Sequence, residues 1–202
     1  MKILFVSSEC APFSKSGGLA DVAFSLPPAL QKTGDDMAIV TPMYRVTQEN
    51  YGDEFERIKT CQIVLGQRRL ACSLYRGALN GVTVYAIGNE HLFHRPRLYG
   101  YGDDSLRFAF FCRAVIDLLP EFGDLPDILH CNDWETALAI LYLKNDAVLR
   151  PELSHIKTVY TIHNIAYQGQ FGRSEMEATF ALPDGWYHGG LSYEFEGRQD
   201  IN

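Results

Sequence analysis

Three short segments of the sequence combine residue types that could do chemistry. Residues 15–19 read KSGGL, residues 130–134 read HCNDW and residues 161–164 read TIHN. The first segment lies in the loop that follows one apolar run, and the other two stand at the ends of later apolar runs; such runs are typical of buried strands. Because ligands of open parallel α/β sheets bind beyond the carboxyl ends of the strands, we expect the three segments to face one crevice.

The first segment could bind an anion. Gly17 and Gly18 lie where a helix is expected to begin, and they would let backbone N–H groups approach a negative charge at the positive helix end. Lys15 would add a full positive charge, so a diphosphate suits this arrangement. The alternative is a tight turn formed by the two glycines beside a solvated lysine.

The second segment has the residue types of a carbohydrate site. Asp133 could accept hydrogen bonds from sugar hydroxyl groups, and Trp134 could offer an apolar face to a pyranose ring. The alternative is structural, with Asp133 as the N-cap of the following helix and Trp134 in the core.

The third segment places His163 and Asn164 at the end of a strand. An imidazole can donate or accept a hydrogen bond near neutral pH, and a carboxamide can do both at once. Both could therefore contact a polar ligand. A histidine whose hydrogen bonds are satisfied within the protein is the alternative.

Several common functional motifs are absent. No Gly-x-Gly-x-x-Gly follows the first strand, and the second strand ends in Thr41 and Pro42 rather than an acid, which disfavours a dinucleotide. Neither a Gly-x-x-x-x-Gly-Lys-Ser/Thr loop nor a Gly-x-Ser-x-Gly elbow occurs. His91 and His94 are expected on the surface, and residues 103–104 in a turn or helix cap. We therefore expect no metal site and no cofactor.

The composition narrows the class of protein. The 202 residues are 47% hydrophobic, enough for one compact domain. The net charge of −7 comes without a basic cluster, which excludes nucleic acid as a partner. Five cysteines without a Cys-x-x-Cys pair favour a reducing cytoplasm. The apolar run after Lys2 has only four residues, too few for a signal peptide or a membrane span.

The apolar pattern predicts alternating strands and helices. Continuous apolar runs predict buried strands at residues 2–7, 37–41, 127–131 and 157–162. Helical spacing predicts helices at residues 19–32, 105–119 and 134–144, of which the second is amphipathic. Pro27 and Pro28 are expected to kink or split the first helix. Three strand-like runs within residues 58–88, with a hairpin turn at Asn80 and Gly81, predict an antiparallel insertion or edge.

These elements form two βαβ units. The predicted fold class is α/β, a Rossmann-like parallel sheet with flanking helices and an antiparallel hairpin insertion. The last forty residues are rich in glycine and aromatic side chains and have weak periodicity. Because a closing helix would be expected to follow, residues 1–202 are interpreted as one domain that is truncated at its C-terminal end.

Five segments together resemble one enzyme family. They are residues 7–22 (SSECAPFSKSGGLADV), 98–108 (LYGYGDDSLRF), 130–138 (HCNDWETAL), 161–171 (TIHNIAYQGQF) and 191–202 (LSYEFEGRQDIN). The sequence is similar over its whole length to the ADP-glucose-dependent bacterial glycogen synthases and plant starch synthases, glycosyltransferase family 5, which have the GT-B fold. The family's Lys-Thr-Gly-Gly-Leu signature appears with Ser16. Asn132 and Glu135 stand where many relatives have the flanking histidines of His-Asp-Trp-His.

The resemblance implies roles for individual residues. Lys15 and Gly18 would face ADP-glucose, and His163 would be the catalytic residue. The residues implied to line the acceptor and glucose side are Asp21, Tyr101, Asp133, Trp134 and Asn164.

The resemblance also implies a reaction. Glucose would pass from ADP-glucose to the non-reducing end of an α-1,4-glucan with retained configuration, without metal or cofactor. A second GT-B domain would complete the site, so residues 1–202 alone should be nearly inactive. One alternative is a GT-B glucosyltransferase that uses UDP-glucose and should lack the KSGGLADV run. The other is a non-catalytic glucan-binding module with Tyr101, Trp134 and Tyr167 as its sugar platform.

Overall fold

A seven-stranded sheet is the centre of the computed structural model, which describes residues 1–186, 192–195 and 198–201. Its order is β3-β4-β5-β2-β1-β6-β7. The strands are β1 (Lys2–Val6), β2 (Asp36–Pro42), β3 (Glu56–Leu65), β4 (Arg68–Leu79), β5 (Val82–Gly88), β6 (Ile128–Asn132) and β7 (Lys157–Thr161). Neighbouring strands from β5 to β7 all run parallel, which confirms the predicted α/β class.

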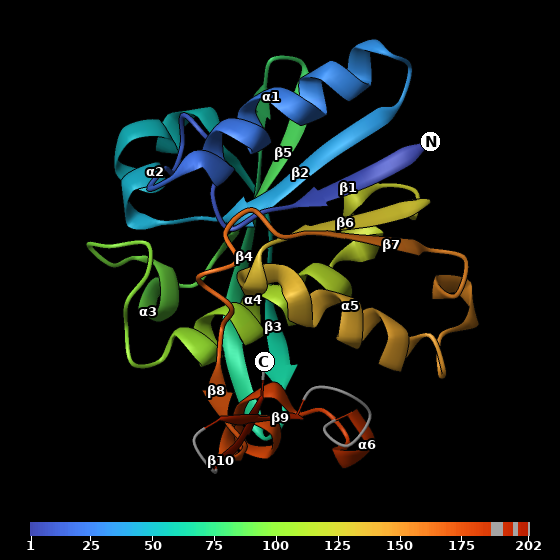
Figure 1. Cartoon of the computed structure of the whole chain (residues 1–202). Coiled ribbons are helices and arrows are strands. Elements are labelled where there is room, and N and C mark those ends of the chain that lie inside the picture. Colours follow the sequence, from blue (N-terminus) through green and yellow to red (C-terminus); the bar gives the residue numbers. More distant parts are fainter. Residues whose placement is uncertain (187–191, 196–197, 202) are drawn as a thin grey trace.

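Helices cover both faces of this sheet (Figure 1). α1 (Gly18–Lys32) lies on one face, and α4 (Asp104–Asp117) and α5 (Trp134–Asp146) lie on the other. Shorter helices and turns are α2 (Arg45–Tyr51), α3 (Glu90–Phe93), α6 (Asp184–Trp186), three 3₁₀ turns (Gly52–Glu54, Leu119–Phe122, Pro151–Leu153) and a π turn (Met176–Phe180). β8 (Phe171–Gly172), β9 (Ser192–Phe195) and β10 (Arg198–Ile201) form a small antiparallel sheet.

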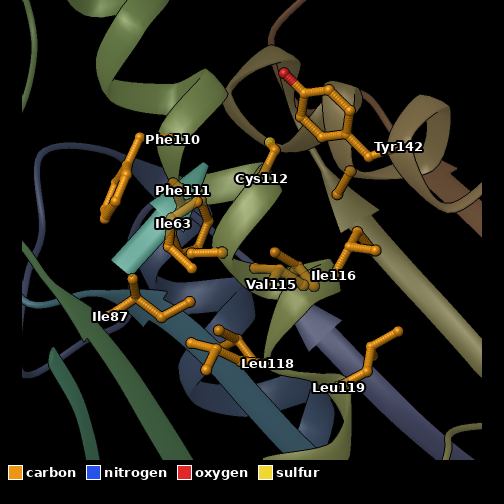
Figure 2. Close-up of a cluster of buried hydrophobic side chains, with 14 of the residues drawn as sticks. Ile63, Ile87, Phe110, Phe111, Cys112, Val115, Ile116, Leu118, Leu119 and Tyr142 are labelled. Atoms are coloured by element: carbon orange, nitrogen blue, oxygen red, sulfur yellow. The ribbon is translucent and has the colours of Figure 1, made fainter. Parts of the chain in front are cut away.

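The two helical layers explain why the central strands are apolar throughout. In β1, Leu4 and Val6 belong to the core under α4 and α5, whereas Ile3 and Phe5 belong to the core under α1. Successive side chains of a strand point to opposite faces, so both sets must be apolar. Figure 2 shows the first core, in which side chains of α4 pack against the sheet.

α4 is buried on nearly every side, so the prediction of an amphipathic helix was wrong. Even Arg107 has no exposed surface. Its guanidinium donates to the carbonyl oxygens of Leu92 and Leu98, at 2.6 and 2.9 Å, and pairs with Asp104 at 2.6 Å. The helix lies between the sheet, α5 and the segment of residues 92–101, which leaves only its last residue, Asp117, exposed.

α1 continues through Pro27 and Pro28 as one helix of 15 residues, so it is not split. Both proline rings are buried. Each proline removes a backbone donor from the helix, and burial of apolar ring surface offsets part of that loss.

The hairpin region differs from the prediction in one respect. β4 is antiparallel to β3 and β5, but β5 pairs parallel with β2 and is buried along nearly its whole length. The third predicted run is therefore a core strand, and only β3 and β4 form the antiparallel edge. The turn before β5 has φ of 51° at Asn80 and 86° at Gly81, which confirms the predicted type I′ hairpin.

β7 was predicted to be buried, but its side chains are largely exposed. Val159 and Tyr160 each keep 41% of their surface accessible. β7 is the last strand of the sheet, and in the described part of the chain only β6 pairs with it. An apolar sequence therefore occurs here on an edge strand.

Two further findings bear on the class of protein. All five cysteines are free, and four of them are buried. Within the described ranges, none of the helices has the length and apolar character needed to cross a bilayer.

The hairpin turn at Asn80 and Gly81 can be tested by glycine substitutions. Gly81→Ala should lower the free energy of unfolding by about 1 kcal/mol, because a side chain disfavours a φ of 86°. Gly52→Ala should raise it by roughly 0.5 kcal/mol, because Gly52 has a right-handed helical φ of −55° and open space around it. Urea denaturation of both variants measures the difference, and changes of the same sign would contradict the assigned turn.

Candidate functional site

The three polar segments lie at or beyond the carboxyl ends of neighbouring parallel strands. β1 and β6 are parallel neighbours, and β7 lies beside β6. The strand order reverses between β1 and β6, which is where open α/β sheets bind ligands. Neighbouring strands are about 5 Å apart, so the carboxyl ends of β1 and β7 are separated by about 10 Å. The residues that follow these strands share one neighbourhood.

The loop between β1 and α1 is anchored by Glu9, which the sequence analysis missed. Only 4% of Glu9 is exposed. Its carboxylate accepts hydrogen bonds from the hydroxyl of Ser16 at 2.6 Å, the N–H of Gly17 at 3.1 Å and the hydroxyl of Tyr99 at 3.0 Å. No sequence pattern marks a loop anchor seven residues before its partner. The N–H of Gly17 is thereby already used within the protein.

Beyond this anchor, the loop exposes one ion pair and the start of α1. Lys15 pairs with Asp21 at 2.6 Å, and about half of each side chain is exposed, at 53% and 60%. Exposed pairs contribute little stability, so Lys15 can exchange this partner for another anion. α1 begins without a side-chain cap, and no atom lies within 4 Å of where a Cβ on Gly18 would be. The N–H groups of the first turn and Lys15 can therefore receive an anion.

Asp133 connects β6 directly to α5 and joins both to the end of β7. Its backbone has φ 57° and ψ 174°. Its N–H donates to the carbonyl oxygen of Thr161 at 2.9 Å. Its carboxylate accepts the N–H of His163 at 2.7 Å and that of Asn164 at 3.4 Å, and it does not cap α5. The structure therefore brings Asp133, His163 and Asn164 together.

The ring of His163 is held by a neighbour of Asp133. Its Nε2 lies 2.9 Å from Oδ1 of Asn132, which is fully buried, whereas His163 as a whole is exposed. A second histidine, His130, lies in β6 with its Nε2 2.8 Å from the hydroxyl of Thr161. Burial lowers the pKa of His130, and the charge of His163 lowers it further.

Trp134 lines an apolar cavity of about 270 Å³ below the end of β7. Its ring packs edge-on against Phe108 and tilted against Phe171, with centroids 5.2 and 5.5 Å apart. Gly169 crosses the ring so closely that a Cβ there would be 2.5 Å from it. Asp133 and Tyr167 also line this cavity, but Lys15 and His163 do not. Trp134 therefore combines the core role with exposure to a cavity.

Tyr101 stands in a cluster of arginines. The guanidinium groups of Arg95, Arg97 and Arg107 lie 4.9, 5.0 and 4.9 Å from the centre of its ring. Its hydroxyl accepts the N–H of Arg97 at 2.9 Å. These contacts order the loop before α4, and the nearby Tyr99 connects that loop to Glu9. The contact of Tyr101 with substrate, which the family resemblance implies, stays a prediction.

Comparison with known proteins identifies the family. The sequence matches the model of the starch synthase catalytic domain over residues 2–202. This chain belongs to that family. The glycogen synthase of Geobacillus thermodenitrificans (strain NG80-2) is 42% identical over 199 residues, covering 98% of this chain and 40% of that protein. The glycogen synthase of Clostridium novyi (strain NT) is 40% identical over 188 residues, covering 93% of this chain and 39% of that protein.

A solved structure agrees with this assignment. The catalytic domain of starch synthase IV from Arabidopsis thaliana, bound to ADP and acarbose, matches with a TM-score of 0.84 and 27% identity. The match covers all of this chain and 41% of that one. The chain thus spans about two fifths of the length of the relatives it matches.

Glu135 is an unusual feature of this starch synthase domain. It lies in the first turn of α5, is 7% exposed, and its Oε2 has no hydrogen-bond partner. Burial raises the pKa of Glu135 to about 8, and Asp133 and Glu9 act in the same direction. Glu135 is therefore mostly protonated at neutral pH. In the described part of the chain, no three His, Cys, Asp or Glu side chains are grouped so that they could hold a metal ion.

Glu135 should make the stability of the domain fall as pH rises. Its pKa in the folded chain is above the ordinary 4.5, so between pH 4.5 and about 8 the folded chain keeps a proton that the unfolded chain releases. The contribution of Glu135 to the free energy of unfolding is therefore largest below pH 4.5 and decreases as the pH rises through this window. Glu135→Gln should remove this slope and be more stable than the parent at pH 8, by on the order of 2–4 kcal/mol. Denaturation at pH 5 and pH 8 measures it, with the exposed Glu54→Gln as control. Equal slopes in parent and Glu135→Gln would contradict the burial of a neutral acid.

The contact between Gly169 and Trp134 predicts a second stability change in this family member. Gly169→Ala should lower the free energy of unfolding by roughly 1–3 kcal/mol, because the new methyl group overlaps the indole and φ is 63°. Gly172→Ala is the matched control, since its Cβ would meet only an ordinary contact at 3.8 Å. A loss of equal size in both variants, measured by urea denaturation, would count against the close packing.

Proposed function

We propose that this chain is the N-terminal domain of a retaining GT-B glucosyltransferase that transfers glucose from ADP-glucose to the non-reducing end of an α-1,4-glucan. Membership of the starch synthase family supports the reaction class. Two relatives are glycogen synthases, and the matching Arabidopsis protein was solved with ADP and acarbose. Because the chain covers about two fifths of these proteins, the activity of the whole protein is part of this proposal.

The observation that carries the proposal is the uncapped start of α1 beside Lys15. The first turn of a helix offers unpaired N–H groups and a positive dipole end, and Lys15 adds an exposed positive charge whose ion pair with Asp21 is also exposed. Gly18 leaves the space in front of these groups open. A diphosphate carries the negative charge and the acceptor oxygens that complement Lys15 and these N–H groups. We therefore assign the diphosphate of ADP-glucose to this surface, without a metal ion.

The sugar side of the site is assigned to the end of β7. His163 and Asn164 are both exposed there, about two strands away from the end of β1, which leads into the Lys15 loop. We assign His163 to orient the glucose and to stabilise developing charge. The sequence offers no evident covalent nucleophile, so the retained configuration is attributed to same-face attack through an oxocarbenium-like state that is stabilised electrostatically.

We further propose that a second GT-B domain closes the site, in line with the greater length of the relatives. The partners are then ADP-glucose, the glucan and that domain, and residues 1–202 alone should show almost no transfer. The free cysteines are compatible with a reducing cytoplasm, where we place the enzyme.

Glucose transfer in a polypeptide that continues from residues 1–202 into the second domain tests the assignment. Lys15→Ala should lower kcat/KM for ADP-glucose by about 10²–10³-fold, because it removes the positive charge that would bind the diphosphate. His163→Ala should lower kcat by a similar factor. Lys32→Ala and His91→Ala, which change exposed side chains elsewhere, should leave both constants unchanged.

Each other outcome has a clear meaning. Full activity of both Lys15→Ala and His163→Ala would remove the site assignment. Preference for UDP-glucose over ADP-glucose would make the protein another GT-B glucosyltransferase. Glucan binding without transfer from either donor would make it a binding module.

A further inference from the structure

The tautomer of His163 is determined by a buried residue that itself cannot reach a ligand. Asn132 has no exposed surface, and its side chain lies between β1, β6 and the end of β7. Its Oδ1 is 2.9 Å from Nε2 of His163. This contact alone leaves open which of the two atoms donates, because either orientation of an amide fits one hydrogen bond.

The other contacts of Asn132 decide the direction. Its Nδ2 lies 3.0 Å from the carbonyl oxygen of Val6 and 3.3 Å from that of His130. Carbonyl oxygens only accept, so the NH₂ group must face them. Turning the amide over would place an oxygen against two oxygens at a buried site. The remaining atom of Asn132, Oδ1, can only accept, and Nε2 of His163 must therefore carry the proton.

We propose that Asn132 is a positioning residue that locks His163 in its Nε2–H form. In a neutral imidazole only one nitrogen carries hydrogen, so Nδ1 of His163 is then a hydrogen-bond acceptor. The exposed ring offers this acceptor to a hydroxyl group of the bound sugar. This role rests on the proposed function, since the sugar is the ligand assigned to the edge at β7.

The last residue of β6, Asn132, and the residue that follows it, Asp133, thus hold His163 together. Asp133 binds its backbone N–H at 2.7 Å, and Asn132 binds its ring at 2.9 Å. One contact sets where the residue lies, and the other sets the rotation of the ring and the location of its proton. Asn132 suits the buried position because it supplies two donors and one acceptor, whereas a carboxylate would face two carbonyl oxygens without a donor.

The same chain provides an internal comparison. Nδ1 of His155 lies 2.7 Å from the carbonyl oxygen of Glu152, which can only accept. His155 must therefore donate from Nδ1 and should be the opposite tautomer. His130 bonds to the hydroxyl of Thr161, which can donate or accept, so its tautomer is not fixed by that contact.

Long-range ¹H–¹⁵N correlation spectra of the ¹⁵N-labelled chain at pH 8 test the proposal directly. His163 should show only the Nε2–H form and His155 the Nδ1–H form. In Asn132→Leu, which keeps the branched shape of the side chain but removes the amide, an Nδ1–H population of His163 should become visible while His155 stays unchanged. Thr136→Val is the matched control, because it removes a buried hydrogen bond to the backbone oxygen of Asn132 and not the ring contact.

The outcomes separate this proposal from the proposed function. An Nδ1–H form of His163 in the parent chain, or an unchanged tautomer in Asn132→Leu, would overturn the role of Asn132 even if transfer is active. The expected spectra together with absent glucose transfer by the two-domain polypeptide would leave the positioning role in place and remove the transferase. In the two-domain polypeptide, Asn132→Leu should lower kcat/KM by between about tenfold and a hundredfold, with Thr136→Val near the parent value.

Discussion

The connection between β6 and α5 consists of one residue, and this constraint shapes the part of the site at β6 and β7. Asp133 must turn the chain alone, and its φ of 57° and ψ of 174° lie near a region that is almost confined to glycine. Such a conformation persists only where its surroundings fix it. The end of β7 does so through Thr161 and His163. On either side of this one-residue turn, Asn132 contacts the imidazole of His163 and Trp134 lines the apolar cavity.

The site therefore has two parts that are built in different ways. The part at β6 and β7 is held by hydrogen bonds between neighbouring strand ends, with Asn132 reaching as far as Val6 in β1. The part at β1 and α1 is held by the buried carboxylate of Glu9, which Tyr99 connects to the loop before α4. The Rossmann-like sheet only brings the carboxyl ends of these strands close together. The identity of a site depends on the side chains placed there rather than on the fold.

The sequence predicted the central strands and long helices because their apolar patterns are strong, and it located the three polar segments because each follows a strand. It failed where tertiary contacts override a pattern. β7 has a core-like sequence but lies at an edge, and Arg107 looks like a surface residue but is buried against two carbonyl oxygens and the carboxylate of Asp104. Short elements such as α2 and α3 have too few turns to show periodicity. Glu9 was missed because its partners are fixed only by the folded loop, and Asn132 was noticed only as a departure from relatives.

The anchoring of the β1–α1 loop by Glu9 has an entropic consequence. Ser16 and Gly17 are already fixed before a ligand arrives, so binding at Lys15 has to order one side chain rather than a backbone segment. Restricting a lysine side chain costs at most about 2 kcal/mol, whereas fixing a backbone costs about 1–2 kcal/mol for every residue. Most of the conformational entropy that a free loop would lose on binding has thus been lost already during folding. Only the side chain of Lys15 still has to be ordered by the ligand.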